Sequence, residues 1–249
     1  MRTYRTLVVT LARSSLREPV GLFFSLIFAP LLVLILGLVF GNDPKPEFSN
    51  RGYIDSTLPA FAALVLAIMG VMVLPVNQLQ LRESGALRRL SATPLTSRTY
   101  IAADLTVNFI VGMVGVILAL LVGVLVFGVS LPSQVSLVLL ACALGLIAFL
   151  ALGYTLAALY PSAAAATGIG NGLMIVLMLT SGAFVPLAEM PEGIQRVMHF
   201  SPVWHFLDLV RGLWNGQSWS DYGTATAVLI GMVIVFGALG ARLFKWNAP

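Results

Sequence analysis

The residues best suited to a chemical task lie between Leu79 and Leu90, where leucines and arginines recur at helical spacing. One face of such a helix carries apolar residues, which are Leu79, Ala86, Leu87 and Leu90. The surrounding arginines are Arg82, Arg88 and Arg89. An apolar stripe with a charged rim can dock in a cleft of another protein, where the rim forms charge-assisted bonds. A basic loop that only sets membrane topology would need the arginines but not the leucines, and the spacing alone leaves both interpretations open.

Other residue combinations in the chain give little support for catalysis. No G-x-x-x-x-G-K-[ST] loop occurs, so the chain is not expected to bind ATP through a P-loop. Two histidines, His199 and His205, are weak evidence for a metal site, and no metal is expected. Ser181 and Gly182 resemble half of an intramembrane protease motif, but no histidine lies in an apolar run to act as a base. The sequence therefore predicts no catalytic residue and no cofactor on this chain.

Six long apolar runs must position these residues. They cover residues 20–40, 58–76, 105–127, 135–159, 165–185 and 224–244, and none contains an ionisable side chain other than cysteine or tyrosine before Arg242. A helix needs about 20 apolar residues to cross the hydrocarbon core. Backbone polar groups cannot stay unpaired in lipid, so runs of this length must be helical there. The sequence predicts an all-α membrane protein with six transmembrane helices in a single domain, residues 1–249.

Basic residues gather at only one set of ends of these runs. That side, which includes both chain ends, holds ten basic and three acidic residues, whereas the other side holds four basic and seven acidic residues. Positively charged short loops stay inside the cell. We therefore expect both termini to be cytoplasmic and the protein to lie in a plasma membrane. The net charge of +4 needs no nucleic-acid partner to explain it.

Residues 1–18 form a basic amphipathic segment before the first run. Tyr4, Leu7, Val8 and Leu11 fall on one helical face, with threonine and arginine on the other. Such a helix can lie in the membrane interface with its arginines on anionic lipid headgroups. A solvated basic leader that only sets topology is the alternative.

Two sequence blocks resemble ABC-2-type transporter permeases. The first block is R-E-x-G-x-L-x-R-L followed by T-P-L, at Arg82, Glu83, Gly85, Leu87, Arg89, Leu90, Thr93, Pro94 and Leu95. The second is S-G-x-F-x-P-x-x-x-M-P, at Ser181, Gly182, Phe184, Pro186, Met190 and Pro191, and it continues at Ser201, Pro202, Asp208, Arg211 and Gly212. The resemblance covers essentially the whole chain. Within the family, the chain looks most like drug-export permeases of the daunorubicin-resistance type, which suggests a bacterial protein.

The resemblance implies a complex of two permease subunits, as a homodimer or heterodimer, with two ATP-binding-cassette ATPase subunits that bind ATP and Mg²⁺. Residues 77–104 would be the cytoplasmic coupling loop, and Leu79–Leu90 would be its coupling helix. Leu87 and Leu90 are expected to fill an apolar pocket on the ATPase, with Glu83, Arg88 and Arg89 as polar contacts. The full set of implied coupling residues is Leu79, Arg82, Glu83, Gly85, Leu87, Arg88, Arg89, Leu90 and Pro94.

The segment 186–223, between the fifth and sixth runs, is too apolar for a solvated loop and too interrupted to span a membrane. Two short helices that re-enter the outer leaflet fit best, with Pro202 at the bend. Asp208 and Arg211 are spaced to pair on one helix face. The resemblance implies an outer gate formed by Ser181, Gly182, Phe184, Pro186, Met190, Pro191, Pro202, Asp208 and Arg211. An interfacial lid with no gating role is the alternative.

The apolar runs offer only uncharged polar groups for a transport path, and the candidates are Asn108, Asn171 and Thr180. Carriers driven by ion gradients bury ionisable residues near the membrane midplane. Their absence from the runs favours an external ATPase as the energy source and an amphiphilic substrate: a drug, lipid or glycolipid moved out of the cytoplasm or inner leaflet. A non-transporting membrane scaffold or assembly subunit of an ATPase complex is the alternative function. Membrane lipids are expected partners in either case.

Overall fold

The structure is a computed structural model that describes residues 2–44, 52–132, 134–180, 193 and 198–244. Every regular element in these residues is a helix, so the predicted all-α class is confirmed. The α-helices are α1 (Arg2–Ser15), α2 (Pro19–Leu22), α3 (Phe28–Phe40), α4 (Tyr53–Ile68), α5 (Leu74–Glu83), α6 (Ala86–Ser91), α7 (Ser97–Phe127), α8 (Val135–Leu159), α9 (Ala163–Thr180), α11 (Pro202–Trp214) and α12 (Gly223–Leu243). Two π-helical stretches, Phe23–Ile27 and Met69–Val73, and a 3₁₀ turn, Trp219–Tyr222, complete the described elements.

Five of these helical segments are long and apolar enough to cross a membrane. They are Phe23–Phe40, Tyr53–Glu83, Ser97–Phe127, Val135–Leu159 and Trp219–Leu243. The apolar helix Ala163–Leu179 is shorter, and the predicted run 165–185 continues past it into residues outside the described ones. Five of the six predicted runs therefore correspond to helices of spanning length, and a span over 165–185 stays a prediction.

The second span is the central element of the bundle. Helices α4 and α5, joined by the π-helical stretch, form one segment of 31 residues, Tyr53–Glu83, whose most apolar part is 94% buried. The sequence pattern placed the end of this span near residue 76. The helix continues because neighbouring helices surround it, so polar residues such as Gln78 find partners inside the protein.

Both π-helical stretches lie against a glycine of a neighbouring helix. A Cβ atom at Gly115 of α7 would overlap the backbone carbonyl of Ser25, and one at Gly153 of α8 would overlap that of Gly70. Small residues let membrane helices approach closely through their backbones. The first and second spans therefore each make a backbone contact at the point where their own helix is widened.

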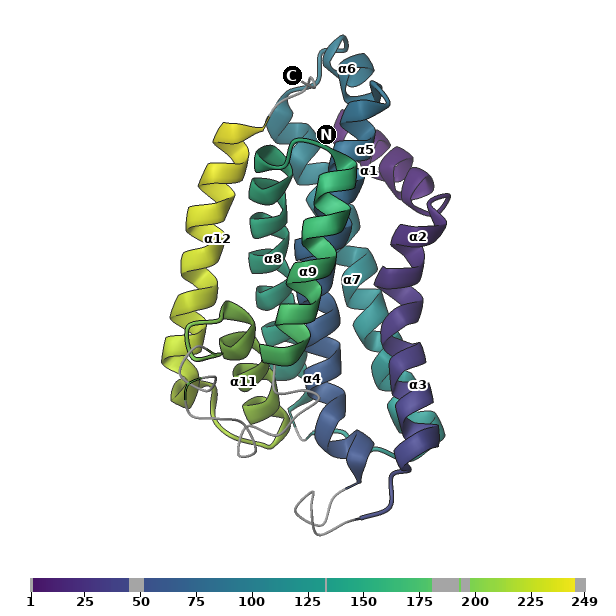
Figure 1. The fold of residues 1–249 in the computed structure, drawn as a ribbon, viewed down its shortest axis with the longest axis vertical. Coiled ribbons are helices and arrows are strands. Elements are labelled where there is room, and N and C mark those ends of the chain that lie inside the picture. The colour runs from purple at the N-terminus through teal and green to yellow at the C-terminus, as the bar shows by residue number, and fades with distance from the viewer. Residues whose placement is uncertain (1, 45–51, 133, 181–192, 194–197, 245–249) are drawn as a thin grey trace.

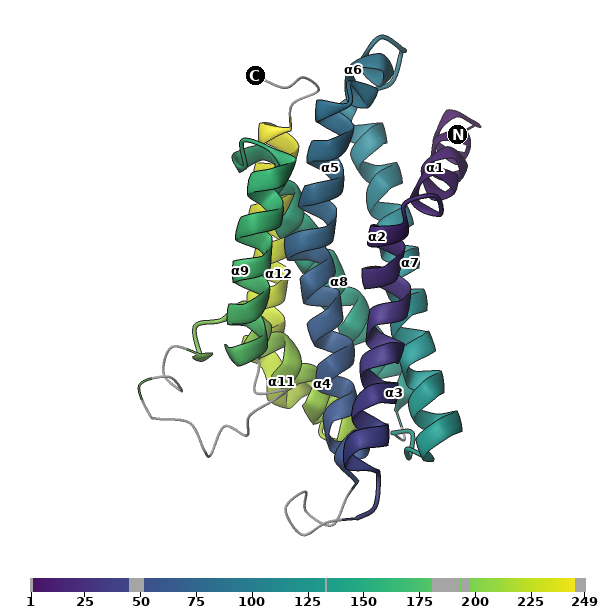
Figure 2. The ribbon, with the colours of Figure 1, turned by 45° about the vertical axis from the view of Figure 1, so that its right-hand side comes forward.

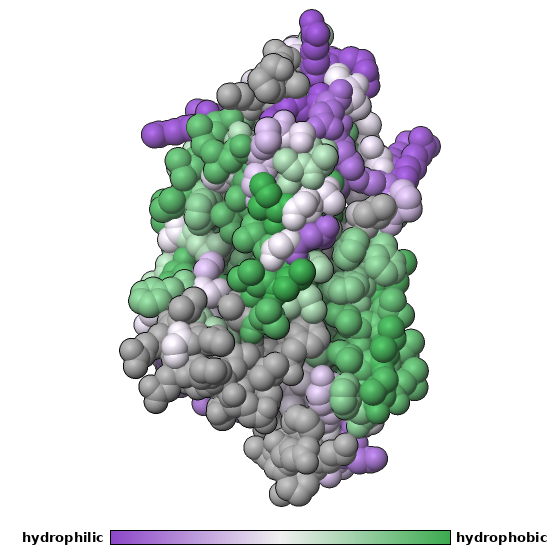
Figure 3. Space-filling model, in the orientation of Figure 1, coloured by the Kyte–Doolittle hydropathy of each residue, from purple (hydrophilic) through white to green (hydrophobic). Residues whose placement is uncertain are grey.

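The two ends of the bundle differ in charge and in architecture. Helices α1 and α6 and the last turn of α12 lie at one end, and α11 lies toward the opposite end (Figure 1). The end of the bundle with α1 and α6 is called the basic end. Its described arginines include Arg5, Arg88, Arg89, Arg98 and Arg242. Hydrophilic residues gather there, and an apolar surface covers much of the visible face below it (Figure 3).

Helix α1 leans away from the bundle axis and contacts the first turns of α7 (Figure 2). Leu7 is buried, and the hydroxyl groups of Tyr4 and Thr106 share a hydrogen bond of 2.7 Å. The apolar face predicted for residues 1–18 therefore contains residues that pack on another helix of the same chain.

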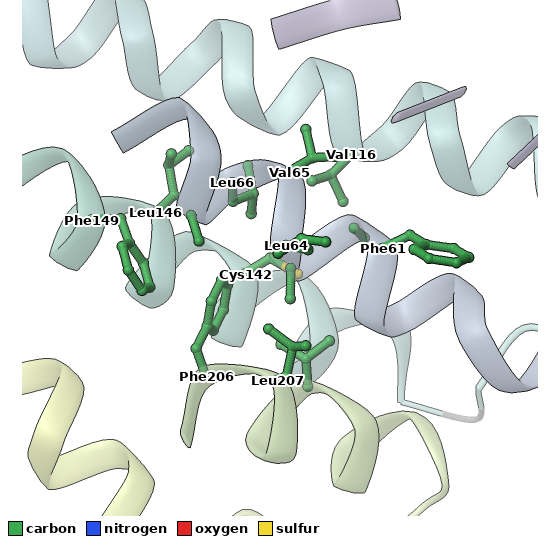
Figure 4. Close-up of a cluster of buried hydrophobic side chains, with 14 of the residues drawn as sticks. Phe61, Leu64, Val65, Leu66, Val116, Cys142, Leu146, Phe149, Phe206 and Leu207 are labelled. Atoms are coloured by element: carbon green, nitrogen blue, oxygen red, sulfur yellow. The ribbon is translucent and has the colours of Figure 1, made fainter. Parts of the chain in front are cut away.

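Helix α11 inserts its apolar face between α4, α8 and α12. Phe206 and Leu207 point into the core toward α8 and α4, where the ring centroids of Phe206 and Phe149 are 5.8 Å apart (Figure 4). Pro202 stands in the first turn of α11, a position that suits its fixed φ angle and missing N–H. Within the described part of segment 186–223, Pro202 therefore begins a helix.

Candidate coupling surface and transport clefts

The helix predicted over Leu79–Leu90 is interrupted, so the prediction of one continuous helix is wrong. Helix α5 ends at Glu83, and α6 begins at Ala86. Gly85 lies between them with φ of +70°, a left-handed conformation that costs a residue with a side chain about 1–2 kcal/mol. Leucines and arginines at helical spacing gave no sign of this turn, although the glycine between Ser84 and Ala86 did.

The interruption divides the implied coupling residues into a buried and an exposed group. Leu79 and Leu87 are 1% and 0% exposed, and Arg82 is 8% exposed. The exposed group comprises Glu83, Arg88, Arg89 and Pro94, and Gly85 and Leu90 are half-buried. Leu87 is therefore part of the chain's own packing, which corrects its expected role in a pocket on a partner. The exposed surface of α6 is chiefly charged.

Glu83 connects this surface to α9. Its Oε1 atom accepts a hydrogen bond of 2.7 Å from the backbone N–H of Ala163, the first residue of α9. A carboxylate at this position also interacts favourably with the helix dipole. Ser162 adds a cap, because its Oγ atom accepts from the N–H of Ala165 at 3.1 Å.

Apolar packing strengthens the same junction. Leu79 of α5 packs with Ala163 and Ala166 of α9, and Val76 and Tyr160 lie against this small cluster. The α5–α9 junction, defined by Leu79, Glu83, Ala163 and Ala166, is separate from the main core. The end of α5 and the first turn of α9 are therefore in direct polar and apolar contact.

A buried polar cluster lies next to this region, between α5, α7 and α8. The Oδ2 atom of Asp104 accepts hydrogen bonds from Gln78 Nε2 at 2.9 Å and Asn108 Nδ2 at 3.1 Å, and from the Tyr154 hydroxyl. The Tyr100 hydroxyl donates to Gln78 Oε1 at 3.0 Å. The cluster links three helices through an acidic side chain that is 7% exposed.

Sequence reasoning missed this cluster because Asp104 precedes the apolar run 105–127 and was assigned to a cytoplasmic loop. Helix α7 begins at Ser97, seven residues before Asp104, with the Thr96 hydroxyl accepting from Thr99 N–H. The available signal was the spacing of Tyr100, Asp104 and Asn108, which places all three on one helix face.

Two clefts open beside the cluster. The first is lined by Leu11, Ser14, Ser15, Glu18, Leu74, Asn77, Gln78, Leu81, Asp104, Val107 and Asn108. The second lies toward α9 and is lined by Glu18, Gly21, Phe24, Met72, Val73, Val76, Asn77, Gln80 and Thr167. Glu18 and Asn77 line both, and burial raises the pKa of the Glu18 carboxyl above its usual value. Together the clefts offer acidic and amide groups beside an apolar wall.

Of the three predicted path residues, Asn108 and Asn171 lie at different places in the bundle. Asn108 lines the first cleft, where its amide donates to Asp104, and Asn171 lies on an exposed face of α9. The side chain of Thr180 lies outside the described residues.

The predicted outer gate is described only in part. Ser181, Gly182, Phe184, Pro186, Met190 and Pro191 lie outside the described residues. Asp208 and Arg211 are both half-buried on α11. Burial raises the pKa of the Asp208 carboxyl, and the positive charges of His205, Arg211 and His199 oppose this effect. Burial lowers the pKa of Arg211, and Asp208 opposes this in turn, so the two charges stabilise each other.

The chain is similar in sequence to known membrane proteins. A family model described as ABC-2 family transporter protein matches residues 42–242, which is most of the chain. The chain belongs to the ABC-2 transporter family. This ABC-2 permease is 28% identical over 179 residues to the candidate transport permease YvfS of Bacillus subtilis (strain 168), covering 69% of this chain and 70% of that protein. It is 28% identical over 247 residues to the candidate transport permease ycf38 of Cyanophora paradoxa, covering 92% of this chain and 83% of that protein.

Family membership confirms the recognition made from the two sequence blocks at the level of ABC-2 permeases. It agrees with the absence of a P-loop from the sequence, since such a permease is a membrane subunit without an ATPase motif. The described residues also contain no group of three or more metal-binding side chains. The chain is a multi-pass membrane protein of a transport family.

Proposed function

We propose that this permease is the membrane-spanning subunit of an ATP-driven exporter, and that a separate ATP-binding-cassette subunit binds and hydrolyses ATP with Mg²⁺. The observation that carries the proposal is the exposed charged surface of α6, connected to α9 through Glu83 and the N–H of Ala163. The basic end is then cytoplasmic, as the distribution of arginines favours. Two permease chains, identical or different, would assemble with two ATPase subunits.

The route for mechanical work would begin at Arg88 and Arg89. Exposed arginines can form bidentate bonds with carboxylates on a partner, and these bonds fix orientation. Leu87 anchors α6 to the rest of the chain because its side chain is fully buried. A movement of the partner would then shift the α5–α6 turn, and the α5–α9 junction would pass this shift to α9. Helix α9 presents an exposed face on which Asn171 and Thr167 lie, and Thr167 lines the second cleft.

The substrate would be an amphiphile, for which a drug, a lipid and a glycolipid are the classes considered. The two clefts support this proposal, because Glu18 and Asp104 supply acidic groups beside an apolar wall formed by Phe24, Met72 and Val73. Among amphiphiles, this arrangement favours one with a polar or positively charged head. Transport would run from the cytoplasm or the inner leaflet outward, as in drug-export permeases of the daunorubicin-resistance type.

The remaining topology belongs to the same proposal. A sixth span would cover 165–185, and segment 186–223 would re-enter the membrane from outside. The packing of α11 between α4, α8 and α12 supports re-entry, because its buried residues lie among helices of spanning length. The half-buried pair Asp208 and Arg211 would then lie near the outer end of the path.

The test is co-purification with the ATPase subunit together with export from cells, both normalised to the amount of permease in the membrane. Replacing Arg88 and Arg89 by Ala should reduce ATPase binding about 100-fold or more, because each of the two lost charge-assisted bonds contributes roughly 1.5–3 kcal/mol in a favourable site. Replacing Arg13 and Arg17 by Ala removes the same charge near α1 and serves as the control. Equal binding and export by both variants would contradict the coupling assignment. Intact ATPase binding with no transport of any amphiphile by the parent protein would instead favour the scaffold function.

A further inference from the structure

A pocket at the basic end lies between α1 and the first turns of α7 and shares no lining residue with the two clefts. It is lined by Tyr4, Arg5, Arg98, Thr99 and Ala102, and is called the α1–α7 pocket. The guanidinium groups of Arg5 and Arg98 come from different helices and are both exposed. Within the described part of the chain, neither has an acidic partner. Two unpaired guanidinium groups facing one pocket suit a phosphate group, which Arg binds with paired N–H donors.

An apolar groove continues from this pocket along α7. It is lined by Leu105, Thr106, Phe109, Ile147 and Leu150, and is called the α7–α8 groove. The pocket and groove are adjacent, because Tyr4 lines the first, Thr106 lines the second, and their hydroxyl groups are hydrogen-bonded at 2.7 Å.

The spacing of residues along α7 aligns the charged and apolar parts. Arg98, Ala102, Leu105 and Phe109 are spaced by four, three and four residues, so they follow one face of the helix. Eleven residues correspond to about 16 Å along an α-helix. The charge therefore lies at the basic end, and the apolar groove extends from it toward the middle of the membrane-spanning region.

We propose that the α1–α7 pocket and the α7–α8 groove together bind one anionic phospholipid from the leaflet at the basic end. The phosphate contacts Arg5 and Arg98, the Tyr4–Thr106 pair lies at the level of the ester groups, and one acyl chain occupies the groove. A free anion would use the arginines but leave the groove unexplained. The lipid would contact α1 and α7 at once and so hold the N-terminal helix in place. This inference does not depend on the substrate or direction of transport.

The experiment uses the full-length chain in nanodiscs that contain equimolar phosphatidylcholine and phosphatidylglycerol. The protein is released from the nanodiscs in the mass spectrometer, and native mass spectrometry identifies the lipids that stay bound to it. The parent protein should retain phosphatidylglycerol in preference to phosphatidylcholine. The double variant Arg5→Gln and Arg98→Gln should reduce that preference roughly 30-fold, since each arginine near an anionic surface contributes a factor of about five. If the double variant does not insert into the membrane, each single variant should reduce the preference for phosphatidylglycerol by a factor of about five.

Two controls separate this site from general charge and from anion binding. The variant Arg88→Gln and Arg89→Gln removes equal charge from α6 and should retain the parent's preference. Glycerol phosphate without acyl chains should fail to displace the lipid at concentrations where short-chain phosphatidylglycerol succeeds. An unchanged preference in the Arg5 and Arg98 variants, an equal loss in the α6 control, or displacement by glycerol phosphate would each overturn the proposal.

Discussion

At the scale of single residues, Glu83 has a position that few exposed carboxylates share, because its partner is the first N–H of another helix. Glu83→Ala removes both the hydrogen bond and the charge at the start of α9, whereas Glu83→Gln keeps an acceptor and removes only the charge. We expect Ala to lower substrate-stimulated ATP hydrolysis of the assembled complex several-fold and Gln to have a smaller effect, as an N-terminal charge contributes about 0.3–1 kcal/mol. Substrate-stimulated hydrolysis rates of reconstituted complexes, measured for the parent and both variants, test whether Ala has the larger effect. A larger effect of Gln than of Ala would contradict it.

The Asp104 cluster allows a second prediction at this scale. Removing the carboxylate with Asp104→Ala leaves donors of Gln78 and Tyr154 without that acceptor, and each buried unpaired group costs about 1–3 kcal/mol. Asn108 keeps its bond of 2.9 Å to the backbone carbonyl of residue 104. Thermal unfolding in detergent should therefore show a large loss of stability for Asp104→Ala. Tyr154→Phe should show a smaller loss.

The double variant tests whether the two groups act together. Asp104→Ala combined with Tyr154→Phe should be less destabilised than the summed single variants, with a coupling of about 0.5–3 kcal/mol. Tyr160→Phe is the matched control, since the Tyr160 hydroxyl is buried without a hydrogen-bond partner in the described structure. Strict additivity would mean that Asp104 and Tyr154 stabilise the fold independently.

Single residues also mark the limit of what the sequence could predict. Arg88 and Arg89 were recognised as a charged rim from their types and spacing, and Glu83 from the resemblance. Gly85 was named only as part of a sequence block, and the turn that it forms was not predicted. The burial of Leu87 and the partner of Glu83 depend on contacts with distant parts of the chain, which spacing along one helix does not contain.

At the scale of elements, the packing of α11 depends on one glycine of α8. A Cβ atom at Gly145 would overlap the ring of Phe206, which is fully buried. Gly145→Val should displace α11 from the bundle or strain the core, and overpacking of this kind costs about 1–3 kcal/mol. A lower unfolding temperature in detergent is expected. Gly168→Val is the control, because no atom lies near a Cβ built at Gly168 in the described structure, and it should unfold like the parent.

Helix ends were predictable where an apolar run stops at a polar turn and not where buried polar residues extend the helix. The run Val135–Leu159 matched the observed α8, which begins and ends at short polar turns. The second span is longer than its apolar run because Gln78 and its partners satisfy polar groups within the bundle. The start of α7 was misplaced for the same reason, since Asp104 is polar but buried.

At the scale of the whole molecule, the described termini and α6 lie at one end and α11 toward the other, which is a testable topology (Figure 1). In a Cys142→Ala background, single cysteines at Gln134 and Gln217 should react with an impermeant thiol reagent applied to whole cells. A cysteine at Ser91 should react only after the membrane is opened. All three positions are exposed in the structure, so burial does not explain a lack of reaction. Labelling of Ser91 in intact cells would reverse the assigned orientation.

The backbone contact between Gly70 and Gly153 has a consequence for the kind of motion that the bundle permits. Interlocked side chains hold helices in discrete arrangements, because each new position needs a new set of rotamers. At this crossing the Gly70 carbonyl oxygen lies where a Cβ atom of Gly153 would stand, and the side chains of Leu74 and Phe149 pack beside it. A rotation of α8 there must move the fully buried Phe149 side chain, so we expect α8 to occupy discrete positions rather than a continuous range. Spin-label distances between α5 and α8 should then form one narrow peak or two separate peaks rather than one broad distribution.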